Sequence, residues 1–159
     1  MRRGSRFRRG VVGLAAVTMS LVLGMPQAAT AATRSLGIVA RDYSFSGISS
    51  RLVAGDYDTR FVNGSRKEPH EVVALNLGPA CAGLTRQQVV AHLDADTIEL
   101  ACPDIAFEGF AFAPPLGRDR VSFTLDAGRT LFVCFIPTPQ GIPHYQLGML
   151  ALSDVITVG

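Results

Sequence analysis

The sequence predicts an all-β domain, an antiparallel sandwich or barrel of about seven or eight short strands with one helical insertion. Beyond Thr33, apolar and β-branched runs are short and are broken by Gly, Pro, Asn and Asp. Residues 120–125 alternate between apolar and polar side chains, as a strand with one buried face does. The chain has 159 residues, is 48% hydrophobic and has 16 Gly without a period, which excludes collagen, coiled coil and a mainly disordered chain.

Residues 1–31 are predicted to be a signal peptide. An arginine-rich start leads into the apolar run 11–25, and small residues precede Ala32. This run of 15 residues is shorter than the span of roughly 20 that a bilayer requires. We therefore expect cleavage, no membrane span afterwards, and a periplasmic, cell-surface or secreted protein. The pair Arg8-Arg9 leaves both the general secretory route and the twin-arginine route open.

Residues 32–159 are predicted to form one domain, because no repeat or second composition divides them. Asp126–Arg129 has the composition of a tight hairpin connection. Thr85 is placed to cap a helix over 86–94, where Val89, Val90 and Leu93 form an apolar stripe. The expected strands are 37–45, 50–53, 57–62, 71–77, 106–112, 120–125, 130–135 and 148–158.

Charge argues against a nucleic-acid partner. From residue 32 onward, 10 basic residues face 13 acidic ones, so this part of the chain has a net charge of −3. Nucleic-acid binding needs a clustered basic surface, and a mildly acidic body does not favour it.

Three cysteines in an exported protein leave one unpaired. Cys81 and Cys102 bracket the helical insertion, and a disulfide between them would close a loop of about 20 residues and stabilise the fold by roughly 3 kcal/mol. Cys134 lies within an apolar run, so it is either a buried free thiol or a partner of one of the other two. Spacing alone does not decide between these connectivities.

The sequence also predicts a metal site that includes Cys134. Cys134, His144 and Met149 occur in that order between two expected strands, and His70 stands where an earlier strand begins. One thiolate, two imidazoles and a weak thioether are the ligands of blue-copper electron-transfer sites. His92 on the expected helix, and the acidic residues Asp42, Glu68 and Glu71, are expected to be solvated.

These residues resemble the cupredoxins, the type-1 blue copper proteins. The resemblance implies a Greek-key sandwich that holds one copper through His70, Cys134, His144 and Met149. Three departures stand out: nine residues separate Cys134 from His144, Val133 replaces the His that feeds the second copper of nitrite reductases, and Glu71 replaces a frequent Asn. The missing His removes a catalytic copper, so the resemblance implies an electron carrier and not an enzyme.

Three functions are weighed against each other. The first is an exported carrier that cycles between Cu(II) and Cu(I); the second is a copper-delivery module; the third is a metal-free interaction domain. A redox partner or copper acceptor is expected to dock beside His144, where the loop places Ile142, Pro143, Tyr145 and Leu147.

Overall fold

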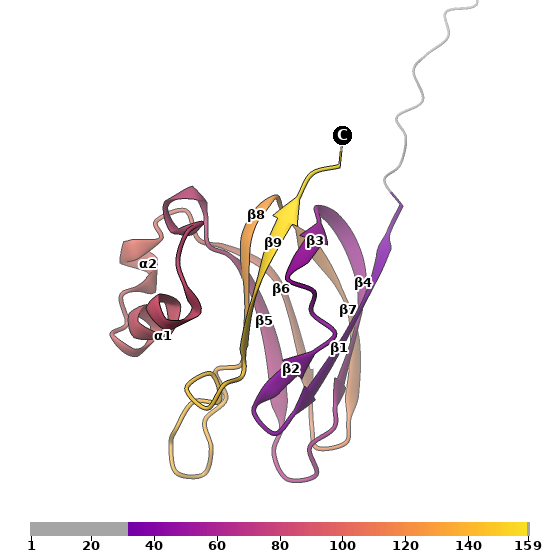
Figure 1. Cartoon of the computed structure of the whole chain (residues 1–159). Coiled ribbons are helices and arrows are strands. Elements are labelled where there is room, and N and C mark those ends of the chain that lie inside the picture. The colour runs from indigo at the N-terminus through magenta and orange to yellow at the C-terminus, as the bar shows by residue number, and fades with distance from the viewer. Residues whose placement is uncertain (1–31, 159) are drawn as a thin grey trace, which may run out of the picture.

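The structure, a computed structural model, describes residues 32–158 as a sandwich of two sheets (Figure 1). The predicted signal peptide lies outside the described residues. The four-stranded sheet has the order β2-β1-β4-β7 and the five-stranded sheet the order β3-β9-β8-β5-β6. The strands are β1 (Arg34–Arg41), β2 (Ser44–Ser46), β3 (Arg51–Val53), β4 (Gly55–Asn63), β5 (His70–Asn76), β6 (Ala106–Ala113), β7 (Arg118–Leu125), β8 (Gly128–Val133) and β9 (Leu150–Ile156).

The predicted β-sandwich is confirmed, and its core forms where the inward side chains of both sheets meet. In β5 every second residue is buried, starting from His70, because successive side chains of a strand point to opposite faces. Phe61, Phe123 and Phe132 are the largest side chains that fill the space between the sheets. Both sheets also contain one parallel pair, β1 with β4 and β3 with β9, so the sandwich is not purely antiparallel.

The expected strand 37–45 is two strands joined by a two-residue turn. Asp42 and Tyr43 both have positive φ, 39° and 64°, and they connect β1 to β2 as a hairpin. Positive φ at both central positions gives a turn whose twist matches that of the flanking strands, although neither residue is glycine. The turn brings Tyr43 to the end of the sandwich that also holds His70 and His144.

The predicted hairpin at Asp126–Arg129 is wrong. β7 belongs to the four-stranded sheet and β8 to the five-stranded sheet, so this connection crosses between the sheets. The buried carboxylate of Glu108 on β6 accepts the Asp126 N–H at 2.6 Å and the Thr130 hydroxyl at 2.9 Å. These bonds tie the connection to the five-stranded sheet, and turn composition alone does not reveal which sheet the next strand joins.

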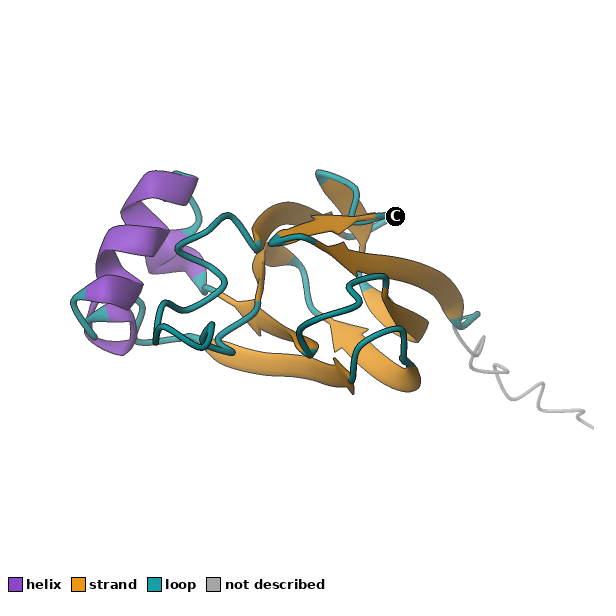
Figure 2. Ribbon diagram, turned by 90° about the horizontal axis from the view of Figure 1, so that it is seen from below, coloured by secondary structure: helices purple, strands orange, loops and turns teal. Residues whose placement is uncertain are grey.

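The helical insertion covers the outer face of the five-stranded sheet (Figure 2). It contains a short 3₁₀ helix (Pro79–Cys81), the predicted helix α1 (Arg86–Asp94) and an unpredicted turn of helix, α2 (Ile98–Ala101). Thr85 caps α1 with the reciprocal bonds to Gln88 that define a capping box. Among the described residues, no helix has the length and apolar character needed to cross a membrane.

A disulfide joins Cys81 to Cys102, and Cys134 is a free, buried thiol. Of the connectivities that the sequence left open, the structure has the one that links the two ends of the helical insertion covalently.

The loop 134–149 lies between β8 and β9. β8 ends at Val133, and β9 begins at Leu150 and not at the expected residue 148, where Gly148 has a φ of 120°. This loop, the β1–β2 turn and the β4–β5 connection gather at one end of the sandwich, the lower end in Figure 1. We call it the loop end.

Candidate metal centre

Neighbouring strands bring His70 and Cys134 to the loop end. β5 and β8 are adjacent and antiparallel, with Val73 opposite Val133, so the first residue of β5 and the residue after β8 share one end of the sheet. Both side chains are buried, with exposed fractions of 1% and 0%. His144, which is also fully buried, reaches the same point from the loop 134–149.

Three potential ligand atoms converge there. The Nδ1 atoms of His70 and His144 lie 3.1 Å apart, and Cys134 Sγ lies 3.4 Å from His144 Nδ1. All three atoms lie within 4.8 Å of one another. The structure thus brings together His70, Cys134 and His144, which we call the triad.

This spacing fits a single metal ion. Two nitrogens at typical bond lengths from one tetrahedral ion lie about 3.3 Å apart, and a nitrogen and a thiolate sulfur lie about 3.6 Å apart. The observed separations of 3.1 Å and 3.4 Å are close to both values. Sulfur with two imidazoles is a donor set that suits copper, and the oxygen-preferring ions magnesium and calcium favour different ligands.

Met149 lies at the far end of the same loop and is fully buried in the core cluster that contains Cys134. Its carbonyl accepts the Cys134 N–H at 3.2 Å, and its own N–H donates to the His144 carbonyl at 3.0 Å. The backbone therefore links the predicted axial ligand directly to two of the three converging residues.

Main-chain hydrogen bonds hold the loop in place. The His144 N–H donates to the Ile136 carbonyl at 2.9 Å, and the Tyr145 N–H donates to the Cys134 carbonyl at 3.0 Å. Pro137 and Pro143 face each other in an isolated bridge, and each proline fixes its own φ. A loop bonded at this many points presents His144 in one orientation.

Burial tunes the protonation of the three residues. Desolvation, and then the neighbouring His144, lower the pKa of His70 to about 4. Desolvation also lowers the pKa of His144, against the opposing effect of Glu68. Both imidazoles are therefore neutral near pH 7 and have a lone pair available for a metal.

The thiol is protonated in the absence of a metal. Burial raises the pKa of Cys134 to about 11, although the backbone N–H groups of Glu71 and Ile136 act in the opposite direction. Because a metal binds the thiolate, binding must displace this proton.

Glu71 supports the loop and is not merely solvated. Its Oε1 accepts the N–H of Phe135, the residue after Cys134, at 3.0 Å. Its backbone N–H also favours the Cys134 thiolate, whereas the charge of its carboxylate raises the pKa of that thiol. The residue in the place of the frequent Asn thus bonds to the ligand loop with its side chain, an arrangement that residue type did not predict.

The expectation that Glu68 is solvated is also wrong. Its Oε2 lies 3.2 Å from His144 Nε2, and only 21% of its side chain is exposed. At this distance the carboxylate acts on the His144 ring and opposes the lowering of its pKa. A carboxylate beside the outer nitrogen of a ligand histidine favours the tautomer whose Nδ1 binds the metal.

Tyr43 covers the site, and sequence analysis missed it. Its ring lies edge-on to His144 at a centroid distance of 5.0 Å and to His70 at 6.5 Å. The Glu68 carboxylate raises the pKa of the Tyr43 hydroxyl. The sequence offers only adjacent Asp and Tyr residues as a sign of the turn. It does not indicate that the Tyr43 ring lies against His70 and His144.

The remaining predicted residues lie away from the three ligand atoms. His92 is partly buried on α1, where its Nδ1 lies 3.0 Å from Thr97 Oγ1, so it is bonded rather than fully solvated. Ile142 and Leu147 are about two-fifths exposed, at 41% and 43%, but Tyr145 is buried. His144 itself has no exposed surface, so the surface beside it consists of its neighbours.

Comparisons with known proteins identify the fold. No protein-family profile and no curated protein matches the chain. Sodium-dithionite-reduced auracyanin from the photosynthetic bacterium Roseiflexus castenholzii superposes with a TM-score of 0.52 at 19% identity, over 79% of this chain and 98% of the other. Auracyanin A, a "blue" copper protein from Chloroflexus aurantiacus, superposes with a TM-score of 0.50 at 22% identity, over 78% of this chain and 99% of the other. The chain has the cupredoxin fold.

Proposed function

We propose that this protein is a single-domain type-1 copper protein that carries electrons between partners outside the cytoplasm. The observation that carries the proposal is the convergence of two imidazole Nδ1 atoms and one thiol sulfur, all from buried residues, in a cupredoxin fold. His70, Cys134 and His144 would hold the ion, with Met149 as a weak axial ligand. When bound, copper would supply a one-electron Cu(II)/Cu(I) couple.

The surrounding residues suit electron transfer. The strand β5 fixes His70, and the hydrogen-bonded loop fixes Cys134 and His144, so the donor atoms are arranged before a metal arrives. A fixed set of ligands limits the geometric change between oxidation states, which keeps the rearrangement that accompanies electron transfer small. Burial of all three residues leaves little room for a substrate, which favours a carrier over an enzyme.

The same burial disfavours copper delivery. A delivery module has to hand its ion to an acceptor, but His144 is fully buried and Tyr43 lies over it. Export is supported by the disulfide between Cys81 and Cys102, because disulfides persist in oxidising compartments. The amino-terminal sequence pattern points the same way.

Copper titration followed by visible absorption tests the proposal. We expect one equivalent of Cu(II) to produce the intense thiolate-to-copper band of a blue copper protein, and Cys134→Ser to abolish it. His92→Ala is the matched control, because His92 is bonded to Thr97 and lies outside the triad; it should leave the band unchanged. A wild-type protein that takes up no copper would favour the metal-free interaction domain.

A further inference from the structure

The described basic residues are unevenly distributed. Six of the 10 that follow residue 31 lie on the outer face of the four-stranded sheet or at its rim at the loop end, and all six are exposed. We call them the basic face: Arg41, Arg60, Arg66, Lys67, Arg118 and Arg120. The face stands out because acidic residues outnumber basic ones over the same part of the chain.

The strands place this face beside the candidate metal centre. Arg118 is opposite Val62 near the end of β4, and the loop that follows β4 leads to His70. The Arg41 side chain lies over Gly64 at the start of this loop, and Arg66 and Lys67 come next in the chain. The basic face therefore borders the loop end.

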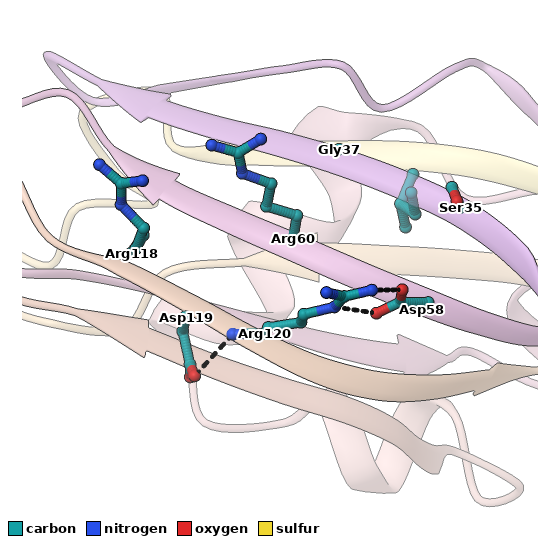
Figure 3. A pocket seen from close by; sticks show the side chains of 8 residues that line it. Ser35, Gly37, Asp58, Arg60, Arg118, Asp119 and Arg120 are labelled. Atoms are coloured by element: carbon teal, nitrogen blue, oxygen red, sulfur yellow. Dashed lines mark hydrogen bonds and ion pairs between the residues drawn. The ribbon is translucent and has the colours of Figure 1, made fainter.

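A groove of about 680 Å³ crosses the basic face (Figure 3). Arg60, Arg118 and Arg120 line it together with Asp58 and Asp119, and Gly37 on β1 lies beside them without a side chain. Gly37 is the register partner of Arg60, and a Cβ atom added to it would meet nothing within 4 Å. The groove is thus open where a side chain on β1 would otherwise project toward the arginines.

Within the part of the chain that the structure describes, two of these arginines have no carboxylate to neutralise them. Arg120 pairs with Asp58, and Asp119 accepts the N–H groups of Phe112 and Arg120. Within residues 32–158, no carboxylate lies at ion-pair distance from Arg60 or Arg118. Figure 3 shows both side chains projecting over the sheet.

The arrangement works against stability. Arg60 and Arg120 are direct register partners on neighbouring antiparallel strands. Like charges in that relation destabilise a sheet. Asp58 offsets the charge of Arg120, but within residues 32–158 no carboxylate offsets that of Arg60. Residues that bind a partner are often retained although they reduce stability. The position of Arg60 opposite Arg120 is explained in this way if their guanidinium groups contact another molecule.

We propose that the basic face is the docking surface for an acidic protein, whose carboxylates enter the groove over Gly37 and pair with Arg60 and Arg118. Guanidinium groups recognise carboxylates through paired hydrogen bonds, and a patch with a net positive charge steers a negatively charged partner toward it. A compact acidic patch or a short acidic peptide suits this surface better than a nucleic acid, whose length would also bring it against the acidic remainder of the chain. That the partner exchanges electrons rests on the proposed function; that it is acidic does not.

Fluorescence anisotropy with a labelled decaglutamate peptide at low ionic strength tests the docking surface. We expect binding that weakens as salt is added, and about a tenfold or greater loss of affinity in the double variant Arg60→Glu, Arg118→Glu. Arg51→Glu is the matched control, because Arg51 is an exposed arginine on the five-stranded sheet; it should change the affinity by less than about twofold.

Two single variants separate docking from folding. Gly37→Val leaves the net charge unchanged and suits a strand, so it should fold well yet weaken peptide binding by partly filling the groove. Arg60→Glu should raise the urea midpoint while it weakens binding, because it replaces the like-charged pair with an opposite-charged one.

Three results would overturn the docking surface. The first is that Arg51→Glu loses as much affinity as the double variant. The second is that the protein does not bind decaglutamate. The third is that it binds phosphatidylglycerol vesicles but not the peptide. Peptide binding is measured without copper, so its failure is distinct from failure of the visible band on copper addition.

Discussion

The protonated thiol of Cys134 predicts that metal binding is coupled to proton release. With a thiol pKa of about 11 and neutral imidazoles near pH 7, binding as a thiolate displaces one proton from Cys134. The apparent affinity for Zn(II), which does not oxidise the thiol, should rise about tenfold per pH unit from about pH 7 toward the thiol pKa. Calorimetry in two buffers with different ionisation enthalpies measures this proton.

Cys134→Ala is the control for this measurement. With the thiol removed, any remaining zinc binding should release no proton from position 134. A wild-type protein that binds zinc without releasing a proton would mean that Cys134 is not a ligand or is already a thiolate.

Tyr43 is predicted to limit access to the metal. Its ring lies 5.0 Å from the His144 ring, and His144 has no exposed surface. Tyr43→Ala should therefore speed the removal of Cu(I) by a water-soluble chelator about tenfold or more. A tenfold change corresponds to a barrier that is lower by about 1.4 kcal/mol. Tyr43→Phe keeps the ring and removes the hydroxyl, so its removal rate should stay near that of the wild type. Equal removal rates in the wild type and both variants would mean that Tyr43 does not limit access to the metal.

Residue types identified the candidate ligands, but the surroundings of these ligands required the structure. His70, Cys134 and His144 could be selected because a thiol and two imidazoles in this order have a chemical meaning together. Glu68 and Tyr43 could not, since a carboxylate or a tyrosine in a loop is ordinarily solvated. Their roles depend on which loops meet at the loop end, and local sequence does not record that.

At the scale of elements, the helical insertion and the sandwich have separate cores. The disulfide Cys81–Cys102 lies in the cluster under the helices, and Cys134 and Met149 lie in the cluster between the sheets. The double variant Cys81→Ser, Cys102→Ser should lower the free energy of unfolding by roughly 3 kcal/mol, as expected for a loop of this length. Urea denaturation measures the loss.

The same double variant should keep the visible band after copper addition, because Cys134 and Met149 belong to the other cluster. Loss of the band at a urea concentration where the variant is still folded would show that the insertion positions the ligands.

The elements were predicted where the pattern was local. α1 has its expected bounds because a capping residue and an apolar stripe define it within nine residues. The connection after β7 was misread as a hairpin because the choice between sheets depends on long-range contacts, here the bonds from Asp126 and Thr130 to Glu108. The β1–β2 turn was missed because no glycine marks it and Tyr43 is not a usual residue at positive φ.

The whole molecule places three features at or beside one end. The buried triad, the cover formed by Tyr43 and the edge of the basic face all lie at or beside the loop end, and the helical insertion covers the outer face of the five-stranded sheet. This arrangement brings a docked acidic partner to the side of the molecule that holds the triad. It also leaves the rest of the described surface predominantly acidic.

The central claim is that His70, Cys134 and His144 form one preorganised copper site. X-ray absorption at the copper edge tests it most directly, in the copper-loaded protein and in both oxidation states. We predict one short copper–sulfur bond and two imidazole nitrogens, with bond lengths that change little on reduction. A copper ion surrounded only by nitrogen and oxygen, or a coordination shell that rearranges on reduction, would contradict the account.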